Sequence, residues 1–108
     1  MKQETYYKCN CGIEMTLKKI GGKWKSLILW FLINEGTKRY GEIRKFLPAI
    51  TNKMLSQQLK ELVLDNLISR KDYGEIPPRV DYTITEKGES LKPILTEMCN
   101  WGNSINCT

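Results

Sequence analysis

Hydrophobic residues recur along the chain at spacings that predict five helices and one hairpin. Ile13, Leu17 and Ile20 lie on one face of a first helix, which two consecutive glycines end. Residues 24–33, with the sequence WKSLILWFLI, are apolar almost all round, which is typical of a helix buried in the middle of a domain. This second helix is therefore predicted to be the centre of the core.

Two further helices with a short connection follow the core helix. Residues 37–39 predict a short extended piece, and residues 40–47 predict a helix that Pro48 ends. Thr51 is a good N-cap for the next helix. The inner stripe of that helix is Leu55, Leu59 and Leu62, and its outer face is Asn52, Lys53, Ser56, Gln57 and Lys60. Such a pair predicts a helix-turn-helix, although an ordinary αα-corner has the same pattern.

A predicted hairpin follows directly. Residues 67–73 and 80–85 have the pattern of two strands around a turn at 74–78. Thr85 is predicted to cap a last helix with Pro93 near its first turn. The apolar stripe of that helix is Leu91, Ile94, Leu95, Met98 and Trp101. A hairpin in this place is typical of the wing of a winged helix, and the alternative is a plain hairpin that covers the core.

These elements predict a mainly α fold with a small β-hairpin wing, a winged helix-turn-helix of the α+β type. We expect residues 1–108 to form a single domain, because the length suits one core of ordinary size. The helix-turn-helix is expected over about 40–66 and the wing over about 67–85.

Charge is unevenly distributed along the chain. The total of 17 Lys and Arg against 12 Asp and Glu gives +5, but residues 16–60 alone are +8, with only Glu35 and Glu42 as acids. Residues 61–108 are −3. A basic first half favours a nucleic-acid partner, whereas the bland alternative is a solvated lysine-rich surface.

On DNA, basic residues set affinity and a few helix residues set sequence preference. The base-contact candidates are Asn52, Lys53, Ser56 and Gln57, in the first two turns of the outward-facing helix. The phosphate candidates are Lys23, Lys25, Lys38, Arg39 and Lys60. Arg79, in the predicted wing, is a candidate for a narrow minor groove.

Composition argues against other classes of protein. The chain has no His, so it lacks the usual general base and the commonest metal ligand, and no enzyme activity or cofactor is predicted. No apolar run reaches the roughly 18 residues of a membrane-spanning helix. The first residues are polar rather than signal-like, so we expect a cytoplasmic protein without a membrane partner.

Four cysteines lie near the ends of the sequence, at Cys9, Cys11, Cys99 and Cys107. A four-thiolate zinc centre is one alternative function, but its usual pairs are two to four residues apart and Cys99 and Cys107 are not, so no metal is predicted. Another alternative is a winged helix that serves only protein contacts. The basic segment and the polar helix face favour DNA.

The sequence resembles the HxlR-type winged helix-turn-helix regulators of bacteria, which are MarR-like in shape. The resemblance spans residues 11–102 and rests on six landmarks in order: CGIE (11–14), IGGKWKSLIL (20–29), GTKRYGEI (36–43), TNKMLSQQLKEL (51–62), PPRVDYTIT (77–85) and GESLKPIL (88–95). It implies a DNA-binding transcriptional regulator, repressor or activator, that is a homodimer through its terminal helices. The sequence departs from the family at Asn52, where many members carry Gln. The base preference of those members is therefore not expected of this chain.

A two-fold dimer predicts an inverted repeat in double-stranded DNA, with recognition helices roughly 34–36 Å apart. The last helix has more apolar surface than so small a core buries, which also indicates a second subunit. The dimer-interface candidates are Ile13, Leu17, Leu95, Met98 and Trp101. The resemblance further implies that Cys11 matches a cysteine that senses electrophiles or oxidants in several members. Lys18 and Lys19 lie near enough to favour its thiolate, and an inert buried thiol is the alternative.

Overall fold

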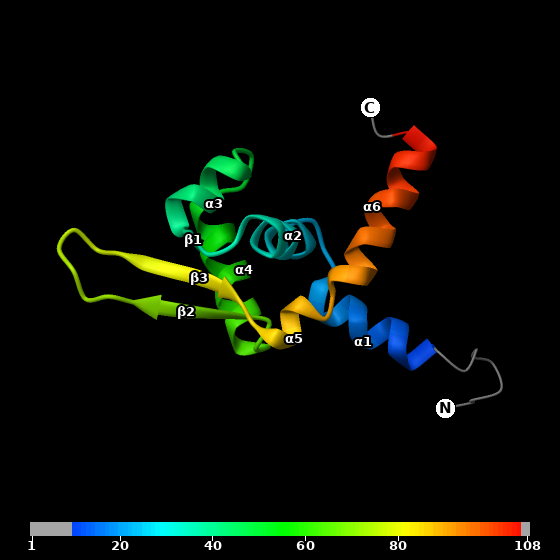
Figure 1. The fold of residues 1–108 in the computed structure, drawn as a ribbon, viewed down its shortest axis with the longest axis horizontal. Helices are drawn as coiled ribbons and strands as arrows, with labels where there is room; N and C mark the ends of the chain where they lie inside the picture. The colour runs from blue at the N-terminus through cyan, green and yellow to red at the C-terminus, as the bar shows by residue number, and fades with distance from the viewer. Residues whose placement is uncertain (1–9, 107–108) are drawn as a thin grey trace.

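The computed structural model describes residues 10–106 (Figure 1). Its elements are α1 (Asn10–Ile20), α2 (Lys25–Glu35), β1 (Lys38–Arg39), α3 (Tyr40–Phe46), α4 (Asn52–Leu64), β2 (Ile68–Asp72), β3 (Val80–Ile84), α5 (Glu86–Glu89) and α6 (Lys92–Asn106). The predicted order of elements is confirmed, and so is the winged helix-turn-helix fold. The difference is at the end of the chain, where one predicted helix is two.

Helix α2 is the centre of the core, as its sequence predicts. Ile28, Leu29 and Leu32 are completely buried. Figure 1 shows α2 between α3, α4 and the sheet on one side and α1 and α6 on the other. A helix that contacts neighbours all round has no face for polar residues, which explains its almost continuous apolar sequence.

Helix α4 begins after the predicted N-cap residue, and its leucine stripe faces the core as predicted. The Thr51 hydroxyl accepts a hydrogen bond from the Met54 backbone N–H at 3.1 Å, which satisfies one of the free amides of the first turn. Leu55, Leu59 and Leu62 are buried against the core. The opposite face of α4 therefore points to solvent.

The connections at both ends of α4 are fixed by hydrogen bonds. In the turn from α3, the Arg44 guanidinium donates to the Ile50 carbonyl at 2.6 Å. After α4, Asn66 has a positive φ of 61°, which Asn tolerates better than most residues. The Leu67 N–H then donates to the Leu62 carbonyl at 3.0 Å, which closes the helix end. The angle at which α4 leaves the core is thus held from both sides.

The sheet has three antiparallel strands in the order β1-β3-β2. Strands β2 and β3 form the predicted hairpin, with Ile68 opposite Ile84. The extended piece predicted at 37–39 contains β1, which pairs with β3 through Lys38 opposite Tyr82. Because β1 leads directly into α3, this pairing attaches the helix-turn-helix to the base of the wing.

Thr85 caps α5 rather than the long last helix. Its hydroxyl accepts from the Gly88 N–H at 3.0 Å. Gly88 is buried, and a Cβ at this position would clash with the Leu67 carbonyl oxygen, so only glycine allows this close approach. The chain then turns at Ser90 and Leu91 before α6 begins, and α6 leaves the core in a new direction.

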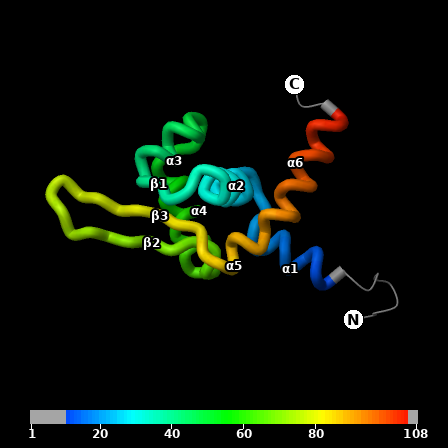
Figure 2. The backbone as a smooth tube through the Cα atoms, in the orientation of Figure 1, coloured from blue at the N-terminus to red at the C-terminus, as the bar shows by residue number. Residues whose placement is uncertain are grey.

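The molecule is elongated, with extents of 57 × 36 × 25 Å and a radius of gyration of 15.9 Å. A compact chain of this length has a radius of gyration of about 13 Å. Figure 2 shows the reason, since the β2–β3 hairpin projects at one end while α1 and α6 diverge at the other. None of the helices in residues 10–106 is long and apolar enough to cross a membrane.

Candidate nucleic-acid interface

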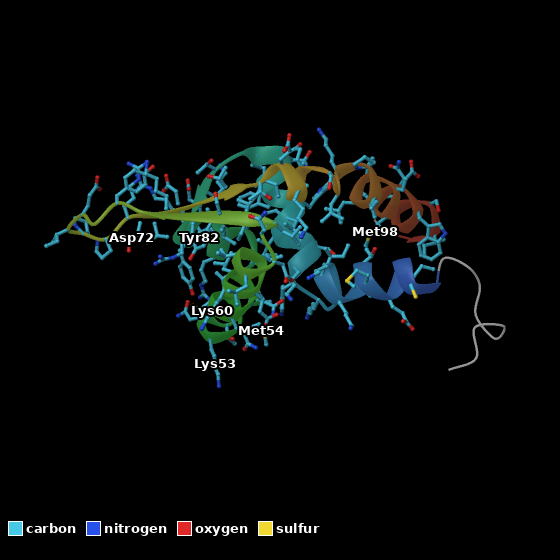
Figure 3. The ribbon with its side chains drawn as sticks, turned by 90° about the horizontal axis from the view of Figure 1, so that it is seen from below. Lys53, Met54, Lys60, Asp72, Tyr82 and Met98 are labelled. Atoms are coloured by element: carbon cyan, nitrogen blue, oxygen red, sulfur yellow. The ribbon has the colours of Figure 1, made fainter. Side chains whose placement is uncertain are left out.

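The structure brings the predicted base-contact residues together on the outer face of α4. All four are exposed: Asn52, Lys53, Ser56 and Gln57. Lys60, about two turns after Asn52, is exposed as well. In Figure 3, Lys53 projects from the edge of the molecule at the exposed end of α4. Among the residues that the structure describes, Lys53 and Lys60 form no ion pair. Their charges are therefore available to an anionic partner.

Two of these side chains are held by a residue that the sequence pattern does not reveal. The Tyr40 hydroxyl lies 3.1 Å from Asn52 Oδ1 and 3.2 Å from the Asn52 carbonyl oxygen. It also lies 3.4 Å from Ser56 Oγ. On the next turn, Gln57 Nε2 donates to the Glu61 carboxylate at 3.2 Å. The polar face of α4 is thus ordered before any ligand binds.

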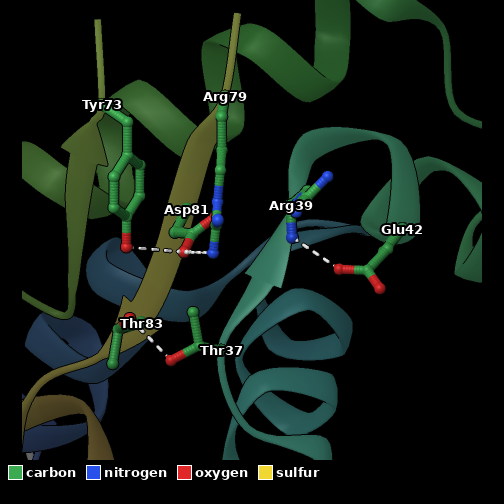
Figure 4. Close-up of polar contacts among 7 residues, drawn as sticks. All are labelled: Thr37, Arg39, Glu42, Tyr73, Arg79, Asp81 and Thr83. Atoms are coloured by element: carbon green, nitrogen blue, oxygen red, sulfur yellow. Dashed lines mark hydrogen bonds and ion pairs between the residues drawn. The ribbon is translucent and has the colours of Figure 1, made fainter. Parts of the chain in front are cut away.

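At the loop end of the β2–β3 hairpin, Arg79 is held between a carboxylate and an aromatic ring (Figure 4). Its Nη2 lies 3.3 Å from Asp81 Oδ2, and its guanidinium carbon lies 4.4 Å from the centroid of the Tyr73 ring. Tyr73 Oη donates to the same carboxylate at 3.1 Å. The hydrogen bond from Arg79 is the main cause of the lowered pKa of Asp81, and Asp81 raises the pKa of Arg79 in return. Arg79 is therefore a fixed rather than a freely moving cation.

A basic groove of about 480 Å³ lies between α3 and the loop end of the β2–β3 hairpin. Arg39, Lys45 and Arg79 supply its positive charge. The Arg39 backbone N–H donates to the Glu42 carboxylate at 2.8 Å, which fixes the start of α3 (Figure 4). Lys45 is not among the residues expected from sequence, because its approach to the wing depends on the three-dimensional fold.

The other phosphate candidates differ in their surroundings. Lys23 is exposed in the turn before α2, with its Nζ 4.8 Å from the Trp24 ring centroid. Lys38 is half-buried, and its Nζ lies 5.7 Å from the Phe31 ring centroid. Neither lysine forms an ion pair within residues 10–106.

Lys25 does not fit its predicted role as a phosphate contact. Its side chain is buried, with 8% of the residue exposed, and its Nζ lies 2.6 Å from Glu61 Oε1. The hydrogen bond from Lys25 is the largest cause of the lowered pKa of Glu61, and the one from Gln57 adds to it. Lys25 faces inward from the first turn of α2, and its ion pair with Glu61 connects α2 to α4. Its charge is therefore paired within the chain and is not available to a phosphate.

At the other end of the molecule, α1 and α6 expose apolar side chains. Ile13, Leu17, Met98 and Trp101 are exposed over 54%, 60%, 51% and 67% of their surface. Leu95 differs from this group, since it is only 4% exposed and packs in the core of its own chain. The prediction that Leu95 faces a second subunit is therefore wrong, because α6 turns this residue toward α2. We call the exposed parts of α1 and α6 the helical arms.

The helical arms also border two grooves. One of about 370 Å³ lies between α1 and the start of α6, and Ile13, Leu17 and Ile94 contribute to it. Another of about 300 Å³ lies between α2 and α6, beside Trp30 and Met98. Met15, Ile94 and Ile105 add exposed apolar surface beyond the predicted dimer-interface residues.

Two cysteines belong to the helical arms. Cys11 is the second residue of α1, and Cys99 is in α6; both are free and exposed. The Lys19 ammonium is 3.1 Å from the Asp65 carboxylate, whereas Lys18 is exposed. Cys9 and Cys107, which the zinc alternative also needs, lie outside the described residues. Residues 10–106 contain no cluster of side chains that would hold a metal ion.

The helix-turn-helix, its exposed polar helix and the wing define a winged helix-turn-helix protein. The chain belongs to the HxlR-like helix-turn-helix family, whose model matches residues 19–107. It is 56% identical over 95 residues to the HTH-type transcriptional regulator YkvN of Bacillus subtilis, a match covering 88% of this chain and 80% of YkvN. The predicted family is therefore confirmed, and the chain is a helix-turn-helix transcriptional regulator rather than an enzyme.

Two solved structures extend this comparison. The redox regulator HypR in its oxidised form superposes with a TM-score of 0.83 and 43% identity, covering 91% of this chain and 100% of HypR. The quinone-bound form of YodB from B. subtilis has a TM-score of 0.74 and 34% identity, covering 88% of this chain and 99% of YodB.

Proposed function

We propose that this regulator binds an inverted repeat in double-stranded DNA as a homodimer, with residues 1–108 as one DNA-binding domain that works in the cytoplasm. The observation that carries the proposal is the outer face of α4, which is polar, basic and exposed along its first two turns. A helix of this kind enters a major groove with its N-terminal residues toward the bases. Asn52, Lys53, Ser56 and Gln57 would contact bases, and the wing would follow the flanking backbone.

Phosphate contacts would come from the basic residues around α4. Lys60 and Arg39 are exposed beside the outer face of α4, and Lys38 and Lys23 form no ion pair with any residue that the structure describes. Arg79 would approach the minor groove from the loop end of the hairpin, where Asp81 and Tyr73 fix its direction. Neutralised phosphates release counterions, so binding would weaken steeply with salt.

The test of DNA binding is a salt titration with the promoter DNA upstream of the protein's own gene. Replacement of Lys60 by alanine should reduce the slope of log K against log salt by about 1, because one phosphate contact is lost. Lys92→Ala is the matched control, since Lys92 is an exposed lysine at the start of α6, away from the recognition face. Absence of binding to any duplex at low salt would overturn the proposal and favour a winged helix that contacts only proteins.

The dimer would form through the helical arms. Ile13, Leu17, Met98 and Trp101 present apolar surface at helical spacing on two elements that project from the core. Such a surface is stable in water when a second copy covers it. A two-fold axis between the arms would place two α4 helices in successive major grooves, roughly 34–36 Å apart.

Reaction of Cys11 with an oxidant or an electrophile would switch DNA binding. Its thiol is exposed in the first turn of α1, where a modification would reach the proposed dimer interface. Support comes from the relatives, because HypR is described as a redox regulator and YodB has quinone-bound and diamide-treated forms. Treatment with diamide or a quinone should change operator binding of the wild type but not of Cys11→Ser.

Cys99→Ser is the matched control for this experiment, since Cys99 is also free and exposed on a helical arm. It should respond to the treatment as the wild type does. An equal response of Cys11→Ser and wild type would overturn the switch and leave the DNA-binding proposal intact.

A further inference from the structure

We infer that Tyr40 determines which base α4 selects, because its hydroxyl turns the Asn52 amide so that the amide nitrogen faces the DNA. The inference rests on the proposed function and deepens it. It gives a specificity-determining role to a residue outside the recognition helix. Tyr40 would not contact the DNA base itself but would position the side chain that does.

The position of Tyr40 suits this role. It is the first residue of α3, immediately after β1, and it packs against the hydrophobic core. Glu42 caps the same helix start by accepting from the Arg39 N–H at 2.8 Å. The ring is therefore anchored, and its hydroxyl reaches the first two turns of α4, within 3.1 Å of Asn52 Oδ1. A fixed hydroxyl selects one orientation of a neighbouring amide.

The direction of the hydrogen bonds follows from the number of protons. A tyrosine hydroxyl has a single proton, and both Asn52 oxygens within reach are acceptors, at 3.1 Å and 3.2 Å. Tyr40 therefore donates to Asn52. In the 3.4 Å contact between Tyr40 and Ser56, the Ser56 hydroxyl must then be the donor. The chain of hydrogen bonds runs from Ser56 through Tyr40 to Asn52.

This direction determines what the exposed face offers to DNA. With Oδ1 turned toward Tyr40, Asn52 presents the two hydrogens of Nδ2 outward. A free asparagine reads adenine with both groups, because it accepts from N6 and donates to N7. Oδ1 keeps a second lone pair, but it is turned toward Tyr40, so we expect Asn52 to meet the DNA with its donors. Guanine presents two acceptors, N7 and O6, in the major groove. We therefore expect guanine rather than adenine at the base pair that Asn52 contacts.

The experiment is a selection from a randomised DNA duplex library with the full-length protein, followed by sequencing. Asn52→Ala first identifies the base position, since that position loses its preference in this variant. At the same position the wild type should prefer guanine over adenine. Tyr40→Phe frees Oδ1 and should shift the ratio toward adenine by about tenfold, because one bidentate pair becomes possible.

Ser90→Ala is the matched control, because it removes a hydroxyl at the end of α5 that donates to the Lys87 carbonyl and does not contact α4. It should keep the wild-type ratio at the Asn52 position. The aromatic ring remains in Tyr40→Phe, so its packing against the core is kept, and thermal unfolding of each variant should match the wild type closely.

The outcomes separate this inference from the proposed function. If the wild type selects a sequence but Tyr40→Phe keeps the same guanine-to-adenine ratio, the inference is overturned and the proposed function stands. A uniform loss of affinity across all sequences would also overturn it, because that is the effect of a merely structural residue. If the wild type selects no sequence at all, the proposed function fails and the inference with it.

Discussion

The two ends of this molecule use the same hydrophobic spacing with opposite results. At the end that carries the proposed DNA-binding face, α4 turns its leucines inward, and Leu59 is 1% exposed. On the helical arms, Leu17 has the same helical pattern but is 60% exposed. A helical stripe of apolar residues therefore indicates that a partner surface covers it, but not whether that surface lies in the same chain.

The largest expected difference is in the free energy of unfolding after one leucine is truncated. Leu59→Ala should lower it by about 2–5 kcal/mol, because the truncation leaves a cavity in a close-packed core. Leu17→Ala should change the stability of the dilute, monomeric protein by less than about 0.5 kcal/mol. Denaturant unfolding at low protein concentration measures both. Equal losses would show that α1 is part of the core.

A charge on the helical arms should act on assembly instead of folding. Trp101→Glu places a carboxylate on a residue that is 67% exposed, so the fold should persist while the dimer dissociates. Operator affinity should fall by about 100-fold, because a monomer reaches only one half-site. Ultracentrifugation and DNA titration measure the two effects.

The control for Trp101→Glu is Ile76→Glu. Ile76 is 98% exposed at the tip of the wing, so the change adds the same charge to an exposed apolar residue at the opposite end. It should leave the dimer intact. A dimeric Trp101→Glu protein would contradict an interface through the helical arms.

Removal of one threonine hydroxyl should lower the stability more at α4 than at α1. Thr51→Ala removes the cap of α4 and should cost about 1 kcal/mol of stability, because the Met54 N–H loses its partner. Thr16→Ala removes a hydroxyl that only donates to the Gly12 carbonyl within α1, at 2.8 Å, and should be nearly neutral. Thermal unfolding compares them, and a larger loss for Thr16→Ala would contradict the assignment of α1 as an exposed arm.

The smallest expected effect is on acid stability. The hydrogen bond from Lys25 lowers the pKa of Glu61 from its usual 4.5, so the ionised form is stabilised in the folded state. This contribution is complete above pH 4.5 and is lost as the pH falls below 4.5 through the folded-state pKa. Glu61→Gln should therefore make stability less dependent on pH in this acid range.

The control for Glu61→Gln is Glu97→Gln, which removes an exposed carboxylate from the arm helix α6. Its acid unfolding curve should keep the slope of the wild type. If both variants flatten the curve equally, the effect comes from net charge rather than from the pair between Glu61 and Lys25.

Local patterns predicted most of the fold. Apolar spacing, the Thr51 cap and the turn residues act over a few neighbouring positions, so the order and approximate bounds of the elements follow from the sequence. The division between α5 and α6 did not follow, because it depends on the approach of Gly88 to the Leu67 carbonyl across the fold. The pairing of β1 with β3 depends on tertiary contact in the same way.

The sequence predicted that α4 has a polar outer face, but not the surroundings of every candidate residue. The outward face of α4 follows from its period, since its polar and apolar residues separate on a helix. Lys25 and Leu95 could not be placed, because each is buried by an element distant in sequence. The sequence did not predict a role for Tyr40 or Lys45 for the same reason. Tyr40 contacts Asn52 of α4, and Lys45 lines the groove beside the wing, only once the chain is folded.

Within the part of the chain that the structure describes, the strand order β1-β3-β2 leaves one edge of β2 without a neighbour. An open edge of this kind is a template on which a strand from another molecule adds, and such addition leads to aggregates without a defined size. Only Ile68 of β2 is buried, and the residues that follow include Arg70, Lys71 and Asp72. A strand that docks on β2 would have to desolvate these charges. The charges on β2 therefore discourage association through the wing, which is consistent with the proposed dimer through the helical arms.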